Sequence, residues 1–113
     1  MIRLKTLLEQ YILPKAYAYN GHIVIIDPKT NTPYHYKLEV DLAFDISVTI
    51  IKIDLKSKTI TYKHPVNGNV LTADLQSKDI AKIAQEYNRI EKGDAIDGLE
   101  TTEGRKLLLT RIS

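Results

Sequence analysis

Two spacings of apolar residues alternate along this chain, and they predict helices near its ends and strands between them. In residues 2–13 apolar side chains recur every three or four positions with charged residues between them, which is typical of an amphipathic helix ended by Pro14. A second such stripe runs through residues 77–92, where Ser77 is a plausible N-cap and Gly93 a natural stop. The sequence therefore predicts an N-terminal and a C-terminal amphipathic helix.

The middle of the chain has the spacing of strands. Residues 23–26 are an unbroken β-branched run, which favours a strand covered on both faces. From Tyr34 to Phe44 apolar and polar residues alternate strictly, as in a strand with one wet face. The alternation resumes at Ile46 and changes phase at Ile50-Ile51, which predicts a β-bulge there.

Turn residues divide this region into consecutive strands. Asn20-Gly21 and residues 27–31 have turn chemistry, and a hairpin is expected around Phe44-Asp45. Residues 55–58 are short and polar, and Pro65 with Asn67-Gly68 separates two further strands. We therefore predict an α+β fold, in which an antiparallel five- or six-stranded meander sheet lies between the two helices.

The composition changes after Gly93. Three of the five glycines and a run of acidic residues fall between residues 93 and 104, and residues 105–112 are again apolar. The prediction is one α+β domain over residues 1–93, followed over 94–113 by a flexible acidic linker and a terminal strand or docking peptide.

Composition and charge exclude several classes of protein. The 113 residues contain no cysteine, which removes disulfides, thiolate nucleophiles, zinc fingers and iron–sulfur clusters. No apolar run approaches the roughly 20 residues that cross a bilayer, so no membrane partner is expected. The prediction is a cytoplasmic protein, or one of a host's cytoplasm, because frequent Ile and Lys suggest an AT-rich phage or mobile element. A net charge of +2 leaves its partners open.

The leading functional hypothesis is a non-enzymatic interaction module that binds another protein or a second copy of itself. An apolar peptide behind a linker can add to a sheet edge, unless it packs back as a strand of its own domain. The second predicted strand adds exposed polar groups. The residues expected to take part are Leu107, Leu108, Leu109, Ile112, His35, Lys37, Glu39 and Asp41.

The first alternative is a nucleic-acid binder that uses the surface of the sheet. Tyrosine rings stack on bases and lysines contact phosphates, and the candidate cations are Lys37, Lys52, Lys56, Lys58 and Lys63. Tyr34 and Tyr36, however, share a strand face with Leu38, so the alternation predicts that they belong to the core or its edge.

The second alternative is a Mg²⁺-dependent nuclease. Asp54 and Lys56 have the D-x-K spacing, which resembles the restriction-endonuclease-like PD-(D/E)XK pattern, with Glu9, Asp41 or Asp45 as further acids. The proline–aspartate element of that pattern is missing. The three histidines, His22, His35 and His64, have no ligand spacing, so neither a metal site nor a cofactor is predicted.

Overall fold

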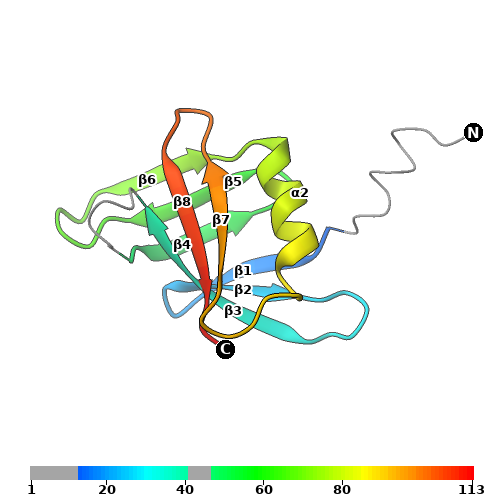
Figure 1. Cartoon of the computed structure of the whole chain (residues 1–113). Coiled ribbons are helices and arrows are strands. Elements are labelled where there is room, and N and C mark those ends of the chain that lie inside the picture. The colour runs from blue at the N-terminus through cyan, green and yellow to red at the C-terminus, as the bar shows by residue number, and fades with distance from the viewer. Residues whose placement is uncertain (1–12, 41–46) are drawn as a thin grey trace, which may run out of the picture.

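The computed structural model describes residues 13–40 and 47–113, and these form eight strands and one helix (Figure 1). In chain order they are β1 (Lys15–Tyr19), β2 (His22–Ile26), β3 (Pro33–Val40), β4 (Thr49–Asp54), β5 (Thr59–Lys63), β6 (Val70–Asp74), α2 (Ser77–Glu86), β7 (Ala95–Glu100) and β8 (Lys106–Arg111). The strands make two antiparallel sheets, β1-β2-β3-β8-β7 and β4-β5-β6. Figure 1 shows β7 and β8 crossing steeply in front of the three-stranded sheet.

The first strand, β1, was not predicted. It pairs with β2 through a two-residue turn in which Asn20 and Gly21 have φ values of 49° and 82°. Two positive φ values suit the twist of a hairpin, and Asn-Gly is the pair that adopts them most readily. The inward face of β1 carries only Ala16 and Ala18, so its apolar signal is weak.

The central strand pattern is confirmed. Ile23, Val24 and Ile25 are all buried, because β2 lies between β1 and β3 and is covered on both faces. Along β3 the alternate residues Tyr36 and Leu38 are buried in the core. The pairing of β4 with β5 shifts register between Ile50 and Lys52, so the bulge is where the change of phase predicted it.

The predicted single meander is wrong in its sheet count and in its last third. Residues 95–100, expected as linker, form β7 and pair with β8. Gly98 lies at the irregularity of β7 with φ 72°, and Gly93 and Gly104 lie in the flanking turns. These glycines therefore shape a hairpin, and the apolar pair Ile96 and Leu99 anchors it in the core.

The second helix is shorter than predicted and is internal, because two strands follow it. α2 begins after Gln76, which takes the N-cap position expected for Ser77, and it ends at Glu86. The next residues are held in turns, where the Asn88 amide donates to the Asp27 carboxylate. Of the helix predicted over residues 2–13, residues 2–12 lie outside the described residues and Leu13 is not helical; the hairpin predicted at Phe44-Asp45 also lies outside them.

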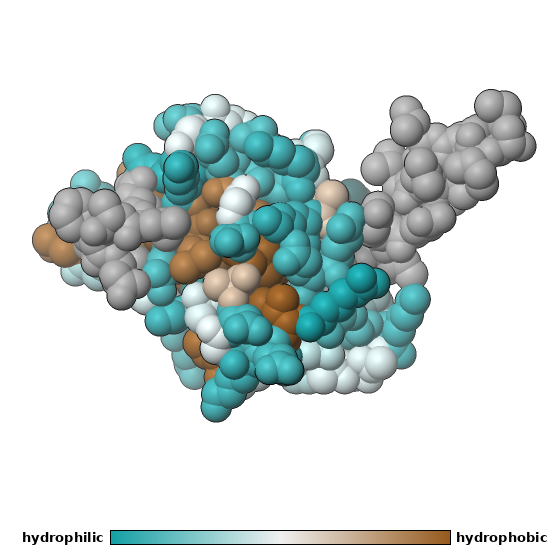
Figure 2. All heavy atoms as spheres, viewed as in Figure 1, coloured by the Kyte–Doolittle hydropathy of each residue, from teal (hydrophilic) through white to brown (hydrophobic). Residues whose placement is uncertain are grey.

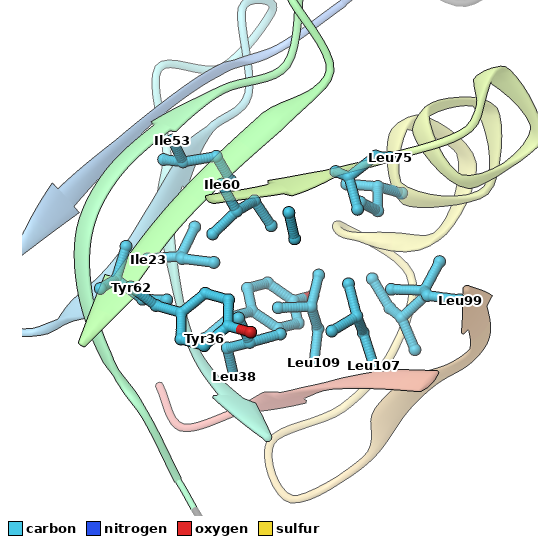
Figure 3. Packing of buried hydrophobic residues seen from close by; sticks show 14 of the residues in the cluster. Ile23, Tyr36, Leu38, Ile53, Ile60, Tyr62, Leu75, Leu99, Leu107 and Leu109 are labelled. Carbon is cyan, nitrogen blue, oxygen red and sulfur yellow. The ribbon is translucent and has the colours of Figure 1, made fainter. Parts of the chain in front are cut away.

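The hydrophobic core fills the space between the two sheets (Figure 3). Figure 3 shows side chains from both sheets pointing toward one another, with Tyr36 and Tyr62 among the aliphatic groups. α2 adds Ile83, and the following Tyr87 accepts a hydrogen bond from the Tyr36 hydroxyl at its backbone carbonyl. Burial of this cluster supplies the main driving force for folding.

Among the connections between the sheets are two isolated β-bridges. At one, Ser47 bridges Glu39, and the Val48 N–H donates to the Leu38 carbonyl. At the other, Leu75 bridges Thr101, next to the start of α2. We call this second place, made by Leu75, Gln76, Asp79, Glu100 and Thr101, the helix joint.

A buried carboxylate holds the helix joint together. Asp79 is 1% exposed, and its oxygens accept from the backbone N–H of Gln76 (3.0 Å) and of Glu100 (3.2 Å). The Gln76 amide donates in turn to the Glu100 carbonyl at 2.9 Å. One side chain therefore links the first turn of the helix to the end of β7.

We predict that Asp79→Ala lowers the free energy of unfolding by about 2–4 kcal/mol, because it leaves two buried backbone N–H groups without an acceptor. Urea unfolding of this variant beside Lys78→Ala, at an exposed neighbouring position, measures the effect. The control should stay within about 0.5 kcal/mol of the wild type. A loss as small as that of the control would show that the joint does not depend on Asp79.

Candidate functional site: the groove between β1 and β4

A groove lies between the edges of two strands, β1 and β4. Residues 13–17 line one bank and residues 52–56 the other, and its volume is about 480 Å³. This is within the range of sites that hold small ligands or a few residues of peptide. We call it the edge groove.

β1 and β4 lie side by side, but within the described ranges a backbone hydrogen bond links β4 to this hairpin only at the turn after β1. The Ile50 N–H donates to the Gly21 carbonyl at 2.8 Å, and a Cβ added to Gly21 would lie 3.2 Å from the Thr49 methyl. Beyond the bulge after Ile50, no backbone hydrogen bond joins the two strands within the described ranges. The turn thus holds the first residues of β4 against β1, and the groove opens toward the last residues of β4.

The β1 bank presents backbone groups to the groove. In a two-residue hairpin the flanking residues, here Tyr19 and His22, form the hydrogen-bonded pair, so every second residue back along β1 also faces β2. The N–H and C=O groups of Ala16 and Ala18 therefore point to the open side.

The β4 bank has the same property. The Leu75 N–H donates to the Lys58 carbonyl and the His64 N–H to the Asn69 carbonyl, so the even-numbered residues of β5 face β6, whereas Thr59 and Thr61 face β4. Their partners Asp54 and Lys52 therefore face β5, and the N–H and C=O groups of Ile53 point away from it. The edge groove thus lies between two unpaired strand edges of the described fold.

The side chains divide the groove into an apolar floor and a basic rim. Ile53 and Leu55 are buried and Ala16 packs against the core, whereas Lys15, Lys52 and Lys56 are exposed. These three lysines and Asp54 are the charged residues of the lining. The rim therefore carries a net positive charge.

Asp54 is turned into the β4–β5 hairpin. Its carboxylate accepts from the N–H groups of Ser57 (3.2 Å) and Lys56 (3.0 Å) and from the Ser57 hydroxyl (2.9 Å). The Ser57 hydrogen bonds are the main cause that lowers the pKa of Asp54, with a smaller contribution from Lys52. The carboxylate thus serves as a turn residue.

A second open edge, along β6, is more restricted. The Thr102 N–H donates to the Asp74 carbonyl and closes one end of that edge. The cavity between β6 and the β7–β8 turn has a volume of about 100 Å³. The edge groove is therefore the roomier of the two.

A histidine pair lies on the outer face of the five-stranded sheet. His22 Nε2 and His35 Nδ1 are 2.8 Å apart, so one ring donates a hydrogen bond to the other. The Tyr19 ring meets both imidazoles edge-on. Burial lowers the pKa of His22 and the charge of His35 lowers it further, while a backbone hydrogen bond with Asn20 partly opposes them.

The residues predicted for protein interaction are dispersed. Leu107 and Leu109 are buried, because β8 lies between β3 and β7, whereas Leu108 and Ile112 are half-buried. Figure 2 shows hydrophobic surface in the middle of the face over β7 and β8, with hydrophilic residues around it.

The predicted polar residues on β3 are less exposed than expected. Glu39 is buried between β8 and Ser47 and forms an ion pair with Lys37 at 3.4 Å. His35 is half-buried in the histidine pair. Asp41 lies outside the described residues.

The lysines predicted to contact nucleic acid are on two sheets. Lys52 and Lys63 lie on the outer face of β4 and β5, and Lys56 and Lys58 lie in the hairpin between these strands. Lys58 Nζ donates to the Ser77 hydroxyl at 2.9 Å. Lys37 belongs to β3 in the other sheet.

The tyrosines of β3 belong to the core or its edge, as the alternation predicted, whereas two tyrosines of β1 are exposed. Tyr36 and Tyr62 are core residues and Tyr34 packs against the core. The exposed rings are those of Tyr17 and Tyr19, at 43% and 52% exposure. The alternation in Lys15–Tyr19 was the signal for them, but it was not interpreted as a strand.

The nuclease hypothesis requires a second acid near Asp54. Among residues 13–40 and 47–113, no three His, Cys, Asp or Glu side chains gather as metal ligands. Glu9, Asp41 and Asp45 lie outside these ranges. Nor does this part of the chain contain a helix long and apolar enough to cross a membrane.

Over the residues that the structure describes, the chain is a small, mostly antiparallel β domain with one short helix. Comparisons with protein-family models, with curated proteins and with solved structures find no match to the chain. Its function must therefore be argued from its own residues.

We predict that the histidine pair makes stability depend on pH. Because the pKa of His22 is lowered by folding, the unfolded chain binds more protons, and stability is lost as the pH falls through the unfolded value of about 6.5 toward the folded one. Thermal melts between about pH 7 and pH 5 should show a smaller loss in His22→Gln than in the wild type.

The matched control is His64→Gln, since His64 lies outside the pair. It should lose stability with falling pH as the wild type does. If His22→Gln follows the same curve as the wild type, the pair does not contribute to this dependence.

Proposed function

We propose that this protein is a non-enzymatic interaction module that binds an extended peptide segment in the edge groove by strand addition. The observation that carries the proposal is a pair of strand edges that have no partner strand within residues 13–40 and 47–113, on either side of one groove with an apolar floor. A strand placed there gains main-chain hydrogen bonds from an edge and buries alternate side chains on the floor.

The groove sets the size and strength of such a complex. Its banks, residues 13–17 and 52–56, span about five residues each, so the bound segment is short. A main-chain hydrogen bond contributes about 0.5–1.5 kcal/mol net, and association itself has an entropic cost. We expect a weak, reversible complex rather than a permanent one.

This proposal moves the interaction surface away from the C-terminal tail. β8 is a central strand, hydrogen-bonded to β3 on one side and to β7 on the other, and its inward residues Leu107 and Leu109 are buried. Releasing it to dock elsewhere would open the core. The edge groove needs no such opening.

A second candidate function is binding of single-stranded nucleic acid. Tyr17 and Tyr19 expose their rings beside Lys15 on the outer face of β1, a combination that suits base stacking and phosphate contact. The affinity of such a complex falls steeply with added salt, whereas strand addition of an uncharged peptide does not. Titration at two salt concentrations distinguishes the two functions.

Amide hydrogen exchange tests strand addition directly. The probe is an acetylated and amidated hexapeptide of alternating valine and threonine, which is uncharged and favours extended structure. We expect it to slow exchange of the N–H groups of Ala16, Ala18 or Ile53, because a bound strand accepts hydrogen bonds from an edge. Unchanged exchange at all three positions under saturating peptide would contradict the proposal.

A backbone variant supplies the matched test. Ala16→Pro removes one N–H from the open edge and leaves the β1–β2 hydrogen bonds intact, whereas Ala16→Ser keeps the N–H. We predict that the proline variant binds the peptide at least threefold more weakly and that the serine variant binds like the wild type. Equal binding by both variants would show that the β1 edge does not take part.

A further inference from the structure

We infer that the segment bound in the edge groove is an alternating sequence of apolar and acidic residues. This inference rests on the proposed function and adds the chemistry of the occupant. Two observations carry it: the inward and outward faces of the two banks, and the charge on the rim.

The faces of the banks determine which positions of a bound strand can be apolar. Ala16 on β1 and Ile53 on β4 point inward, whereas Lys15 and Lys52 point to solvent. A strand added in the same layer continues this alternation, so every second side chain lies over the floor and the others lie beside the rim. The bound peptide must therefore carry an apolar residue at every second position.

The charge of the rim determines which residues suit the outward positions of the bound strand. Lys15, Lys52 and Lys56 are exposed and line the groove from both banks, and Asp54 is the one acid among the described residues of the lining. Its carboxylate is occupied by three hydrogen bonds from the hairpin turn. Outward carboxylates on the bound strand would thus meet ammonium groups on either side.

The same features disfavour other ligands. A strand with outward lysines would face like charges, and a strand with its acids in one block would place a carboxylate over the apolar floor. A nucleic acid would satisfy the lysines but leave the floor and the strand edges unused. The alternating acidic peptide is the ligand that uses all three features.

Four peptides of equal length separate these contributions. They are the valine–threonine peptide, an alternating valine–glutamate peptide, an alternating valine–lysine peptide, and a peptide with the valines in one block and the glutamates in another. Binding is followed by the amide shifts of Ala16, Ala18 and Ile53. We expect the alternating glutamate peptide to bind about three- to tenfold more tightly than the threonine peptide at low salt.

The lysine and block peptides should bind more weakly than the threonine peptide. Added salt should remove the advantage of glutamate and leave the threonine peptide unaffected. If the threonine peptide binds and the glutamate peptide gains nothing, or if the lysine or block peptide binds as tightly as the alternating one, the inferred chemistry is wrong while strand addition stands. If none of the four binds, the proposed function itself fails.

Charge variants locate the effect. The triple variant Lys15→Gln, Lys52→Gln, Lys56→Gln should lose the preference for glutamate and bind the threonine peptide like the wild type, which also shows that it is folded. Lys63→Gln is the control, because Lys63 is exposed on the same sheet but does not line the groove. A preference that persists in the triple variant, or displacement of the peptide by an equimolar thymidine decamer, would overturn the inference.

Discussion

The architecture depends on how two separate sheets are held over one core, and the carboxylate of Asp79 is central to that constraint. It accepts backbone hydrogen bonds from the start of α2 and from the end of β7, at the place where Leu75 bridges Thr101. A buried charge is stable only when it is fully hydrogen-bonded, so this residue fixes the helix and the β7–β8 hairpin together. The sheets cannot slide past each other while this joint is intact.

The short joints between the sheets leave strand edges open elsewhere. The five-stranded sheet ends at β1 and the three-stranded sheet begins at β4, and the Ile50 hydrogen bond to Gly21 links β4 to the turn after β1. The bulge after Ile50 changes the direction of β4 at that point. The edge groove is thus a consequence of the joints and the bulge, and each of its banks is the edge strand of a sheet.

Local patterns predicted the local structure of this chain but not how its strands are arranged. The alternation along β3, the buried run of β2 and the phase change at Ile50 are all properties of one strand, and each appears in the sequence. The division into two sheets depends on which distant strands pair, as β8 does with β3. β1 was missed because its inward residues are alanines, and β7 because glycines and acids surround its two apolar anchors. The groove depends on both β1 and the division into two sheets, so the sequence pointed only to Lys52, Asp54 and Lys56 of its charged residues, and not to Lys15 or to the groove itself.

The lysines of the rim also account for how such an edge can exist in a stable protein. An exposed strand edge invites pairing with a second copy, and lysines beside it are a common protection, since two copies would bring like charges together. Lys15, Lys52 and Lys56 are placed to do this at the edge groove. The repulsion that opposes self-association becomes attraction for a strand that carries carboxylates, and the apolar floor favours one whose apolar side chains alternate with them. The feature that keeps the edge open is therefore the feature that selects its partner.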